Sequence, residues 1–214
     1  MSQYISAEEA AAKVKDGMTV MIGGFLANGT AEKVIEAMVR SGVKDLTVIT
    51  NDTAYPDRGV GLLLGAGQIK KLIVSYIGAT PKASELMNSG EIEIEFAPQG
   101  TLAERIRCGG FGLGGVLTPT GLGTIVAEGK EVLNIDGKDY LLEKPLRADV
   151  ALIGASQCDP DGNLRYRGTS RNFNPMMATA ADVVIVESRE MVETGVIAPE
   201  DVHTMGMLVD YIVK

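Results

Sequence analysis

The sequence predicts an α/β protein with a mainly parallel, open sheet flanked by helices and with antiparallel strands in its second half. Short apolar runs of strand character alternate with helical segments through the first hundred residues, which is typical of βαβ units. Small or neutral polar residues follow each of these strands. Residues 130–142 then predict a hairpin, because Asp136 and Gly137 lie at its centre.

Capping and terminating residues predict the first two helices and the strand between them. Residues 6–9 have the S-x-x-E spacing of a capping box, and the alanine-rich helix behind them is expected to end near residues 16–17. Residues 19–24 (TVMIGG) form an apolar strand that runs into glycines. We expect Thr30 to cap the next helix, which closes at Gly42.

Three further strands are expected at residues 46–50, 71–79 and 91–97, with a helix between the last two. The last strand alternates polar and apolar residues, which indicates one wetter face. Thr101 and Glu104 then have capping-box spacing, so a short helix is predicted that ends at Gly109 as its left-handed C-cap.

The second half adds strands at residues 148–155 and 181–188, which share an Ala-Asp-Val start and are expected to hold similar positions in the sheet. Residues 159–163 (DPDGN) predict a turn. Because no linker or low-complexity segment divides the chain, residues 1–214 are expected to form one domain.

Composition excludes several classes of function. The formal net charge is −8, which disfavours binding to nucleic acid or to an anionic membrane. Cys108, Cys158 and the one histidine, His203, do not form a common zinc spacing, and no metal site is expected. The N-terminus is polar and helical, and the apolar runs are too short to span a membrane, so a cytoplasmic protein is expected.

The candidate ligand site is the edge where the early parallel strands end. Residues 23–25, 51–53, 78–80 and 98–100 all follow strands and are small or neutral polar. In an open parallel sheet these ends line one crevice. The site is therefore suited to a long polar ligand that the main chain approaches closely.

The first strand-to-helix loop, GGFLANGTAEKV, is the most informative of these ends. Unpaired N–H groups and the dipole at a helix N-terminus favour an anion there. The alternative is that the glycines only form a tight turn. Lys33, inside the helix, could contact a ligand or simply be solvated.

Gly110, Gly112 and Gly115 match the G-x-G-x-x-G pattern of dinucleotide-binding proteins. That fingerprint requires a strand before the glycines and a helix after them. Here a predicted helix precedes them and VLTPTG, an extended segment, follows. The dehydrogenase interpretation therefore fails, and a glycine loop beside the sheet edge remains.

No catalytic residue is predicted. Asp52 and Glu187 are the carboxylates at strand ends, and each is more commonly a cap or a solvated end than an acid–base catalyst. A Ser-His-Asp arrangement would have to recruit His203 and is not expected. The chain has a ligand-binding edge without a reactive group.

Four segments together resemble the α chain of the family I, 3-oxoacid-type coenzyme A transferases, in particular the acetate and butyrate–acetoacetate types. They are residues 16–30 (DGMTVMIGGFLANGT), 50–57 (TNDTAYPD), 97–124 and 170–175 (SRNFNP). The family signature has proline where this chain has Ala31. Position 31 is expected to begin the helix, where alanine also serves.

The resemblance implies that coenzyme A moves between a short-chain acyl-CoA and a carboxylic acid such as acetate, butyrate or acetoacetate by a ping-pong route. A glutamate attacks the thioester and becomes a glutamyl–CoA thioester. In this family the glutamate lies in a Ser-Glu-Asn-Gly motif of the β subunit, and this chain has no such motif. A β partner, an α2β2 assembly and no cofactor apart from coenzyme A thioesters as substrates are implied.

The resemblance also implies which residues bind. Coenzyme A would lie on the loop formed by Gly23, Gly24, Phe25, Leu26, Ala27, Asn28 and Gly29, and the acyl or carboxylate end would meet Asn51, Gln99, Gly110 and Gly112. The alternative is a metabolite-binding or sugar-phosphate isomerase-like domain of the same architecture. An isomerase would need acid–base residues and a basic phosphate site, which the sequence does not offer. The glycines gathered at one edge disfavour a non-catalytic scaffold.

Overall fold

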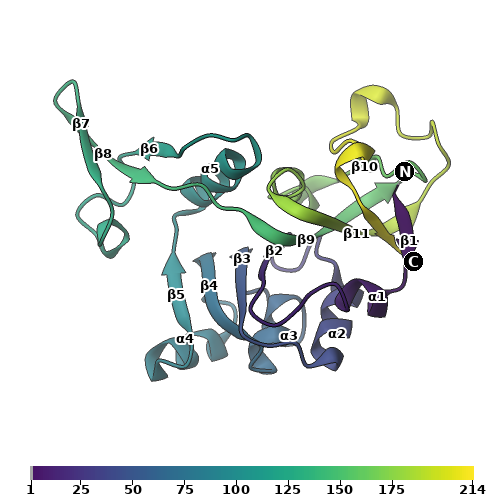
Figure 1. Cartoon of the computed structure of the whole chain (residues 1–214), viewed down its shortest axis with the longest axis horizontal. Helices are drawn as coiled ribbons and strands as arrows, with labels where there is room; N and C mark the ends of the chain where they lie inside the picture. The colour runs from purple at the N-terminus through teal and green to yellow at the C-terminus, as the bar shows by residue number, and fades with distance from the viewer. Residues whose placement is uncertain (1) are drawn as a thin grey trace.

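A computed structural model describes residues 2–214 and is built around one large sheet (Figure 1). Its strands follow the order β1-β12-β11-β9-β2-β3-β4-β5, every neighbouring pair on this path is parallel, and β10 is added antiparallel to β9. The strands are β1 (Gln3–Ile5), β2 (Thr19–Ile22), β3 (Leu46–Asp52), β4 (Ile69–Tyr76), β5 (Glu93–Phe96), β9 (Ala148–Cys158), β10 (Leu164–Arg165), β11 (Ala181–Met191) and β12 (Tyr211–Val213). The predicted fold class, a mainly parallel sheet with helices around it, is confirmed.

Helices cover both faces of this sheet. One buried apolar cluster joins the sheet to α1–α4, and a second joins its other face to α5 and α6. The helices are α1 (Ala7–Ala11), α2 (Glu32–Ser41), α3 (Val60–Gly65), α4 (Pro81–Ser89), α5 (Gln99–Gly110) and α6 (Asn174–Met177), with 3₁₀ turns η1 (Ile125–Ala127), η2 (Gly168–Ser170), η3 (Pro199–Asp201) and η4 (Gly206–Leu208). The two layers are visible above and below the sheet in Figure 1.

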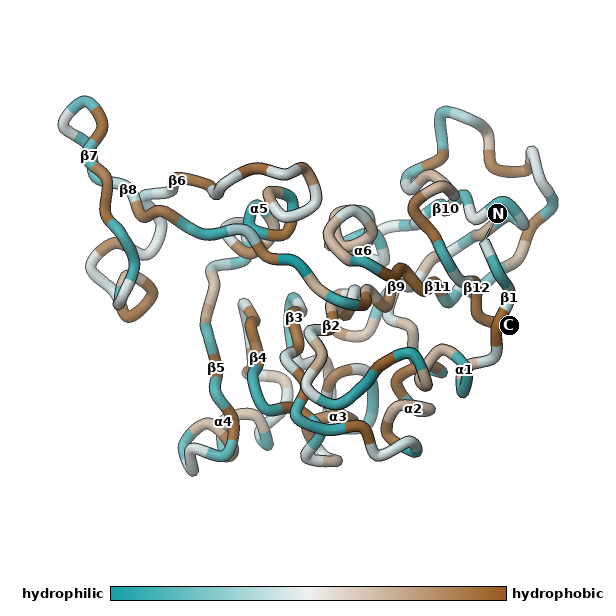
Figure 2. The backbone as a smooth tube through the Cα atoms, in the orientation of Figure 1, coloured by the Kyte–Doolittle hydropathy of each residue, from teal (hydrophilic) through white to brown (hydrophobic). Residues whose placement is uncertain are grey.

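The alternation of side chains explains why the central strands are apolar throughout. Val20 and Ile22 of β2 point into the α1–α4 cluster, whereas Met21 points into the α5–α6 cluster. Successive side chains of a strand point to opposite faces, so a strand covered on both sides is a continuous apolar run. Figure 2 shows such hydrophobic stretches along β9 and β11.

The two strands that share an Ala-Asp-Val start are direct neighbours. Ala148 of β9 is paired with Ala181 of β11, and Val150 is paired with Val183, in parallel register. The expectation of similar sheet positions is confirmed. Residues 150–155 and 184–186 are buried, whereas Asp149 and Asp182 are exposed at the strand starts, so the two strands share the same pattern of burial.

A separate antiparallel sheet stands away from this body in Figure 1 and is called the wing here (residues 116–143). It consists of β6 (Val116–Thr118), β7 (Val132–Ile135) and β8 (Lys138–Glu143) in the order β6-β8-β7. Asp136 and Gly137 have φ of +52° and +77°, as a type I′ hairpin turn requires. The predicted hairpin is confirmed.

The predicted end of α1 and the predicted cap of α2 were wrong. Helix α1 ends at Ala11 and not near residues 16–17, although its capping box between Ser6 and Glu9 is present. The N-cap of α2 is Ala31, because Thr30 instead donates its hydroxyl to the carbonyl of Gly23 at 2.8 Å. For α2, the hydrogen bond that closes the glycine loop thus overrides the local capping signal.

Helix α5 also begins and ends elsewhere than predicted. It starts at Gln99 with Pro98 as N-cap, so Thr101 lies inside the helix and caps nothing. Gly109 is helical, and the chain takes up the left-handed conformation only at Gly112, with φ of +69°. The order of helix, glycines and extended strand that argued against a dinucleotide site is confirmed, because α5 precedes the glycines and β6 follows them.

Candidate functional site

The ends of β2, β3, β4 and β5 lie side by side, as predicted, because these strands are consecutive neighbours in the sheet. The loop after β2, residues 23–30, is called the glycine loop here. Phe25 and Asn28 exchange two backbone hydrogen bonds, of 3.0 and 2.9 Å, around a two-residue turn. Leu26 and Ala27 at its tip have φ of +45° and +66°. Such a turn favours Asn-Gly, so these two residues are strained.

Asp52, at the end of β3, anchors the tip of this loop. Its buried carboxylate accepts hydrogen bonds from the N–H groups of Leu26 (3.1 and 3.2 Å) and Ala54 (2.8 Å). The side-chain amide of Asn51 donates a third, at 2.6 Å. The carboxylate is thus held by N–H donors and serves as a structural anchor.

The same network continues to the first residue of α5. The Asn51 oxygen Oδ1 accepts from Gln99 Nε2 at 2.7 Å and from the Ser75 hydroxyl at 3.2 Å. Asn51 is 2% exposed, so its amide is fixed between Asp52 and Gln99. The structure therefore brings the predicted residues Asn51 and Gln99 together with the tip of the glycine loop.

These residues border a cleft of about 300 Å³, which is called the strand-end cleft here. It is lined by Phe25, Leu26, Asn51, Asp52, Ser75, Tyr76 and Gln99. Ser75 and Tyr76 were not predicted; a serine and a tyrosine at the end of the apolar run KLIVSY were the available signal. The cleft is small and offers neutral amide and hydroxyl groups, which suits a short polar molecule.

Several main-chain donors of the glycine loop are already used within the protein. The N–H groups of Gly23, Phe25 and Asn28 donate to backbone carbonyls, and that of Leu26 donates to Asp52. Within residues 2–214, the N–H groups of Gly24, Ala27 and Gly29 donate to no other group. The N–H of Thr30 likewise has no acceptor among these residues. Gly24 is buried and borders neither the strand-end cleft nor the hollow on the other side of the loop, so Ala27, Gly29 and Thr30 are the donors that the loop can offer to a ligand.

The N-terminus of α2 is not open to an anion, contrary to expectation. Glu187, at the end of β11, accepts hydrogen bonds there from the N–H groups of Lys33 (2.9 Å) and Val34 (3.3 Å). Burial raises the pKa of the Glu187 carboxyl, and these hydrogen bonds only partly offset that rise. Glu187 is therefore a helix cap, supplied from a strand distant in sequence.

A second hollow of about 300 Å³ lies beside this cap, on the side of the glycine loop that bears Ala27 and Gly29. Its lining includes Lys33, Glu187 and Arg189. Glu32, which also borders it, accepts from the N–H of Gly59 at 2.9 Å, and burial raises the pKa of its carboxyl. The loop thus separates two hollows.

Gly110 and Gly112 lie at the other end of α5 from Gln99. Eleven residues of helix place Gly110 about 16 Å from Gln99. Neither glycine lines the strand-end cleft. A side chain at Gly110 would overlap Thr179, so close packing accounts for that glycine, and the contribution of both residues to substrate binding stays a prediction.

The remaining candidates have structural surroundings. Cys108 and Cys158 are buried free thiols, and burial raises the pKa of Cys158 to about 12. His203 accepts a hydrogen bond from the N–H of Tyr166 at 3.0 Å, and burial lowers the pKa of its ring. Residues 2–214 contain no group of side chains suited to a metal ion. None of the described helices is both long and apolar enough to cross a bilayer.

Comparison with known proteins gives matches along the whole chain. Residues 4–214 match the family described as Coenzyme A transferase. The chain is 51% identical over 212 residues to the alpha subunit of the acetate CoA-transferase of Escherichia coli K12, covering 99% of this chain and 96% of the relative. It is 52% identical over 213 residues to the acetoacetyl-CoA:acetate/butyrate CoA transferase alpha subunit of Clostridium acetobutylicum, covering 100% and 98%.

Solved structures agree on the fold. An acyl-CoA transferase from Escherichia coli O157:H7, in a thioester complex with CoA, superposes with a TM-score of 0.86 at 24% identity, covering 99% of this chain and 47% of that one. The glutaconate coenzyme A-transferase of Acidaminococcus fermentans gives 0.86 at 22% identity, covering 99% and 75%.

Proposed function

This chain belongs to the coenzyme A transferase family, and on that premise we propose that it moves coenzyme A between a short-chain acyl-CoA and a carboxylate of the acetate, butyrate or acetoacetate class. It is an enzyme subunit of the coenzyme A transferase type, since its relatives at 51% and 52% identity are named as alpha subunits of such enzymes. Those names carry the proposal for the substrate class. The isomerase-like alternative is not favoured.

The strand-end cleft supports a short acid as substrate. Gln99, which is exposed, presents an amide group that can hydrogen-bond a carboxylate or a thioester carbonyl. Asn51, which is 2% exposed, orients that amide by accepting from Gln99 Nε2 at 2.7 Å, while Phe25 and Tyr76 supply apolar walls. A volume of about 300 Å³ is at the small end for ligand pockets. Coenzyme A would follow the glycine loop, with the N–H groups of Ala27, Gly29 and Thr30 as its main-chain donors.

The reactive carboxylate would come from a β subunit. Asp52, the carboxylate that lines the cleft, is buried and occupied by three groups of N–H donors. In the proposed reaction a glutamate oxygen of the partner attacks the thioester carbon, and the coenzyme A thiolate leaves. The thiolate then attacks the glutamyl carbonyl of the resulting anhydride, which releases the first acid; a second acid reverses both steps. An α2β2 assembly, as in the family, is part of this proposal.

The first test compares the isolated chain with its complex with the β partner. We expect no transfer by the chain alone and transfer from acetoacetyl-CoA or butyryl-CoA to acetate by the complex. A panel of acyl-CoA donors and carboxylate acceptors then defines the substrates. Transfer by the isolated chain would contradict the assignment of the nucleophile to the partner.

A pair of variants tests the cleft. Phe25 and Tyr55 each open a four-residue turn after a strand and are similarly exposed, at 36% and 42%, but only Phe25 lines the cleft. Phe25→Ala should lower kcat/KM of the complex by roughly tenfold, as loss of about 1.4 kcal/mol of transition-state binding would. Tyr55→Ala should change it little. Equal effects of the two substitutions on kcat/KM would contradict the assignment of the strand-end cleft to substrate binding.

A bulky substitution at Gly24 is a poorer test of ligand binding than the sequence suggests. It has φ of +123°, and an added side chain would overlap the Thr30 hydroxyl, which closes the loop by bonding to Gly23. A bulky substitution there would disturb the fold of the loop as well as its binding.

A further inference from the structure

The segment SRNFNP contributes a residue to the glycine loop that the proposed function does not use. Asn174, the first residue of α6, has no exposed surface and lies 145 residues from Gly29 in sequence. It reaches the base of the loop from the α6 face of the sheet. Its position calls for an explanation because a fully buried amide is stable only when it is hydrogen-bonded.

Each polar atom of the Asn174 side chain has a backbone partner. Nδ2 donates to the carbonyl of Gly29 at 2.9 Å and to that of Ser170 at 2.8 Å. Oδ1 accepts from the N–H of Gly154 at 3.3 Å. Two carbonyls require a donor and one N–H requires an acceptor, so these partners fix the orientation of the amide.

The three glycines around this amide leave room for it and for each other. A side chain at Gly23 would overlap Asn174 Oδ1, one at Gly29 would overlap Ser170, and one at Gly154 would overlap Gly29. Gly154 also donates its N–H to Gly29 at 3.1 Å. The base of the glycine loop is thus packed directly against Asn174 and β9.

We propose that Asn174 is a positioning residue for the coenzyme A transferase reaction, which holds the glycine loop in its binding conformation. The loop is strained at Leu26 and Ala27 and is anchored at two places, at its tip by Asp52 and at its base by Asn174. Without the second anchor the strained turn can relax, and Ala27 and Gly29, which line the same hollow, are no longer held in place. The role in the reaction rests on the proposed function; the anchoring itself does not.

Asn174→Asp tests the anchor while preserving its shape. The new carboxylate has no N–H to offer and faces the carbonyls of Gly29 and Ser170. Asn163→Asp is the matched control, because Asn163 also bridges two segments, donating to Asp159 at 2.9 Å and accepting from the N–H of Gly206 at 3.0 Å, away from the cleft. Gly23→Ala, which pushes against Asn174 Oδ1, is a second variant that loosens the same contact.

Amide hydrogen exchange of the chain, read by peptide mass spectrometry, is the first measurement. In Asn174→Asp and Gly23→Ala, exchange in a peptide that covers residues 23–30 should be about tenfold faster or more, as expected for a loop that has lost a hydrogen-bonded anchor. Asn163→Asp should accelerate exchange near residues 159–163 and 204–206 instead. If the loop peptide is unchanged, or if exchange rises equally over the whole chain, the anchoring role is overturned.

Steady-state kinetics of the complex with the β subunit is the second measurement. Asn174→Asp should raise the KM for the acyl-CoA roughly tenfold and leave the KM for the acceptor carboxylate near its original value. A merely structural role would move neither KM. Faster loop exchange with both KM values unchanged would support the anchor and overturn the assignment of the loop to coenzyme A, so the two proposals fail separately.

Discussion

At the scale of single residues, the glycine loop combines conformations that its residues do not favour. Leu26 and Ala27 both have positive φ although neither is glycine, and a left-handed residue with a side chain costs about 1–2 kcal/mol. Asp52 and Asn174 supply the hydrogen bonds that keep them there. Strain held in this way at a binding loop is a form of preorganisation.

Ala27→Gly and Gly29→Ala should therefore change stability in opposite directions. Removing the side chain at position 27 relieves strain but increases the entropy of the unfolded chain, so we expect a net gain of roughly 0.5 kcal/mol. Adding one at Gly29, with φ of +81°, forces it against Ser170 and should cost about 2–3 kcal/mol. Urea unfolding of both variants measures this. A loss of stability in Ala27→Gly would argue against strain at the turn.

At the scale of elements, α5 shows why its glycines cannot be interpreted from the helix alone. Gly109 is buried inside the helix, and an added side chain would overlap the carbonyl of Leu146. The N–H of Leu146 in turn bonds to the carbonyl of Arg105 at 2.9 Å. The glycine permits the chain leading into β9 to pack directly on the helix.

Gly109→Ala should destabilise the protein although alanine is the better helix former. We expect a loss of about 1–3 kcal/mol from overlap with Leu146. Gly100→Ala, in the first turn of the same helix and with open space around it, should be neutral or stabilise by up to about 1 kcal/mol. Thermal unfolding of the two variants distinguishes packing from propensity; the same sign for both would refute the packing explanation.

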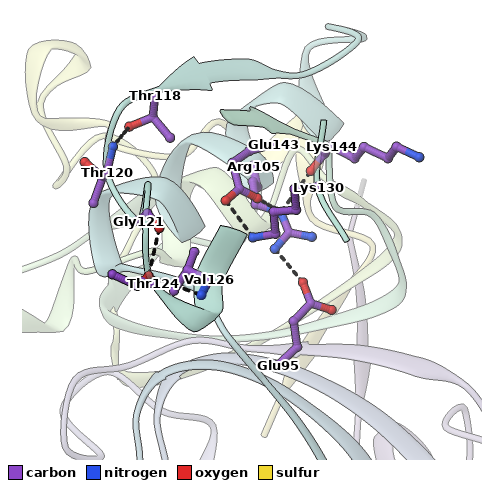
Figure 3. A network of polar contacts seen from close by, with 10 residues as sticks. All are labelled: Glu95, Arg105, Thr118, Thr120, Gly121, Thr124, Val126, Lys130, Glu143 and Lys144. Atoms are coloured by element: carbon purple, nitrogen blue, oxygen red, sulfur yellow. Dashed lines mark hydrogen bonds and ion pairs between the residues drawn. The ribbon is translucent and has the colours of Figure 1, made fainter. Parts of the chain in front are cut away.

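At the scale of the whole molecule, a chain of buried and partly buried charges joins the wing to the α/β body (Figure 3). Glu143 of β8, with no exposed surface, binds Lys130 at 2.7 Å and lies 3.7 Å from Arg105 of α5. Arg105 also binds Glu95 of β5 at 2.7 Å. Burial, the largest single effect, would raise the pKa of the Glu95 carboxyl, but Arg105 and Lys71 together outweigh it and lower the pKa. Its contribution to stability is therefore lost as the pH falls through that lowered pKa.

Glu143→Ala should strongly weaken these ion pairs between the wing and the α/β body. It leaves the buried Arg105 without one of its two acidic partners and Lys130 without its partner, which should cost about 3 kcal/mol. Glu8→Ala removes an exposed pair with Arg40 and should produce no measurable change. Urea unfolding followed by circular dichroism compares them. If both substitutions changed the free energy of unfolding equally, burial of the ion pairs at Glu143 would contribute nothing to stability.

The sequence by itself determined the alternation of strands and helices in the first half, the parallel sheet and the edge on which the polar strand ends gather, whereas β1, α6 and β12 were not predicted. These features depend on local signals: the period of apolar residues, the turn at Asp136 and Gly137, and the small residues after each strand. It also determined the family, because the resemblance rests on motifs spread along the whole chain. The rejection of a dinucleotide site at Gly110–Gly115 needed only the order of neighbouring elements.

Tertiary structure alone decided which groups of that edge are still available. Glu187 and Asn174 reach this part of the chain from more than 140 residues away, one capping α2 and the other holding Gly29 of the glycine loop. Such contacts depend on which elements become neighbours, and no local pattern records that Glu187 of β11 meets the start of α2 or that α6 begins beside the loop after β2. Thr30 and Thr101 matched capping rules and do not act as caps, because the Thr30 hydroxyl closes the glycine loop onto Gly23 and because α5 begins two residues before Thr101.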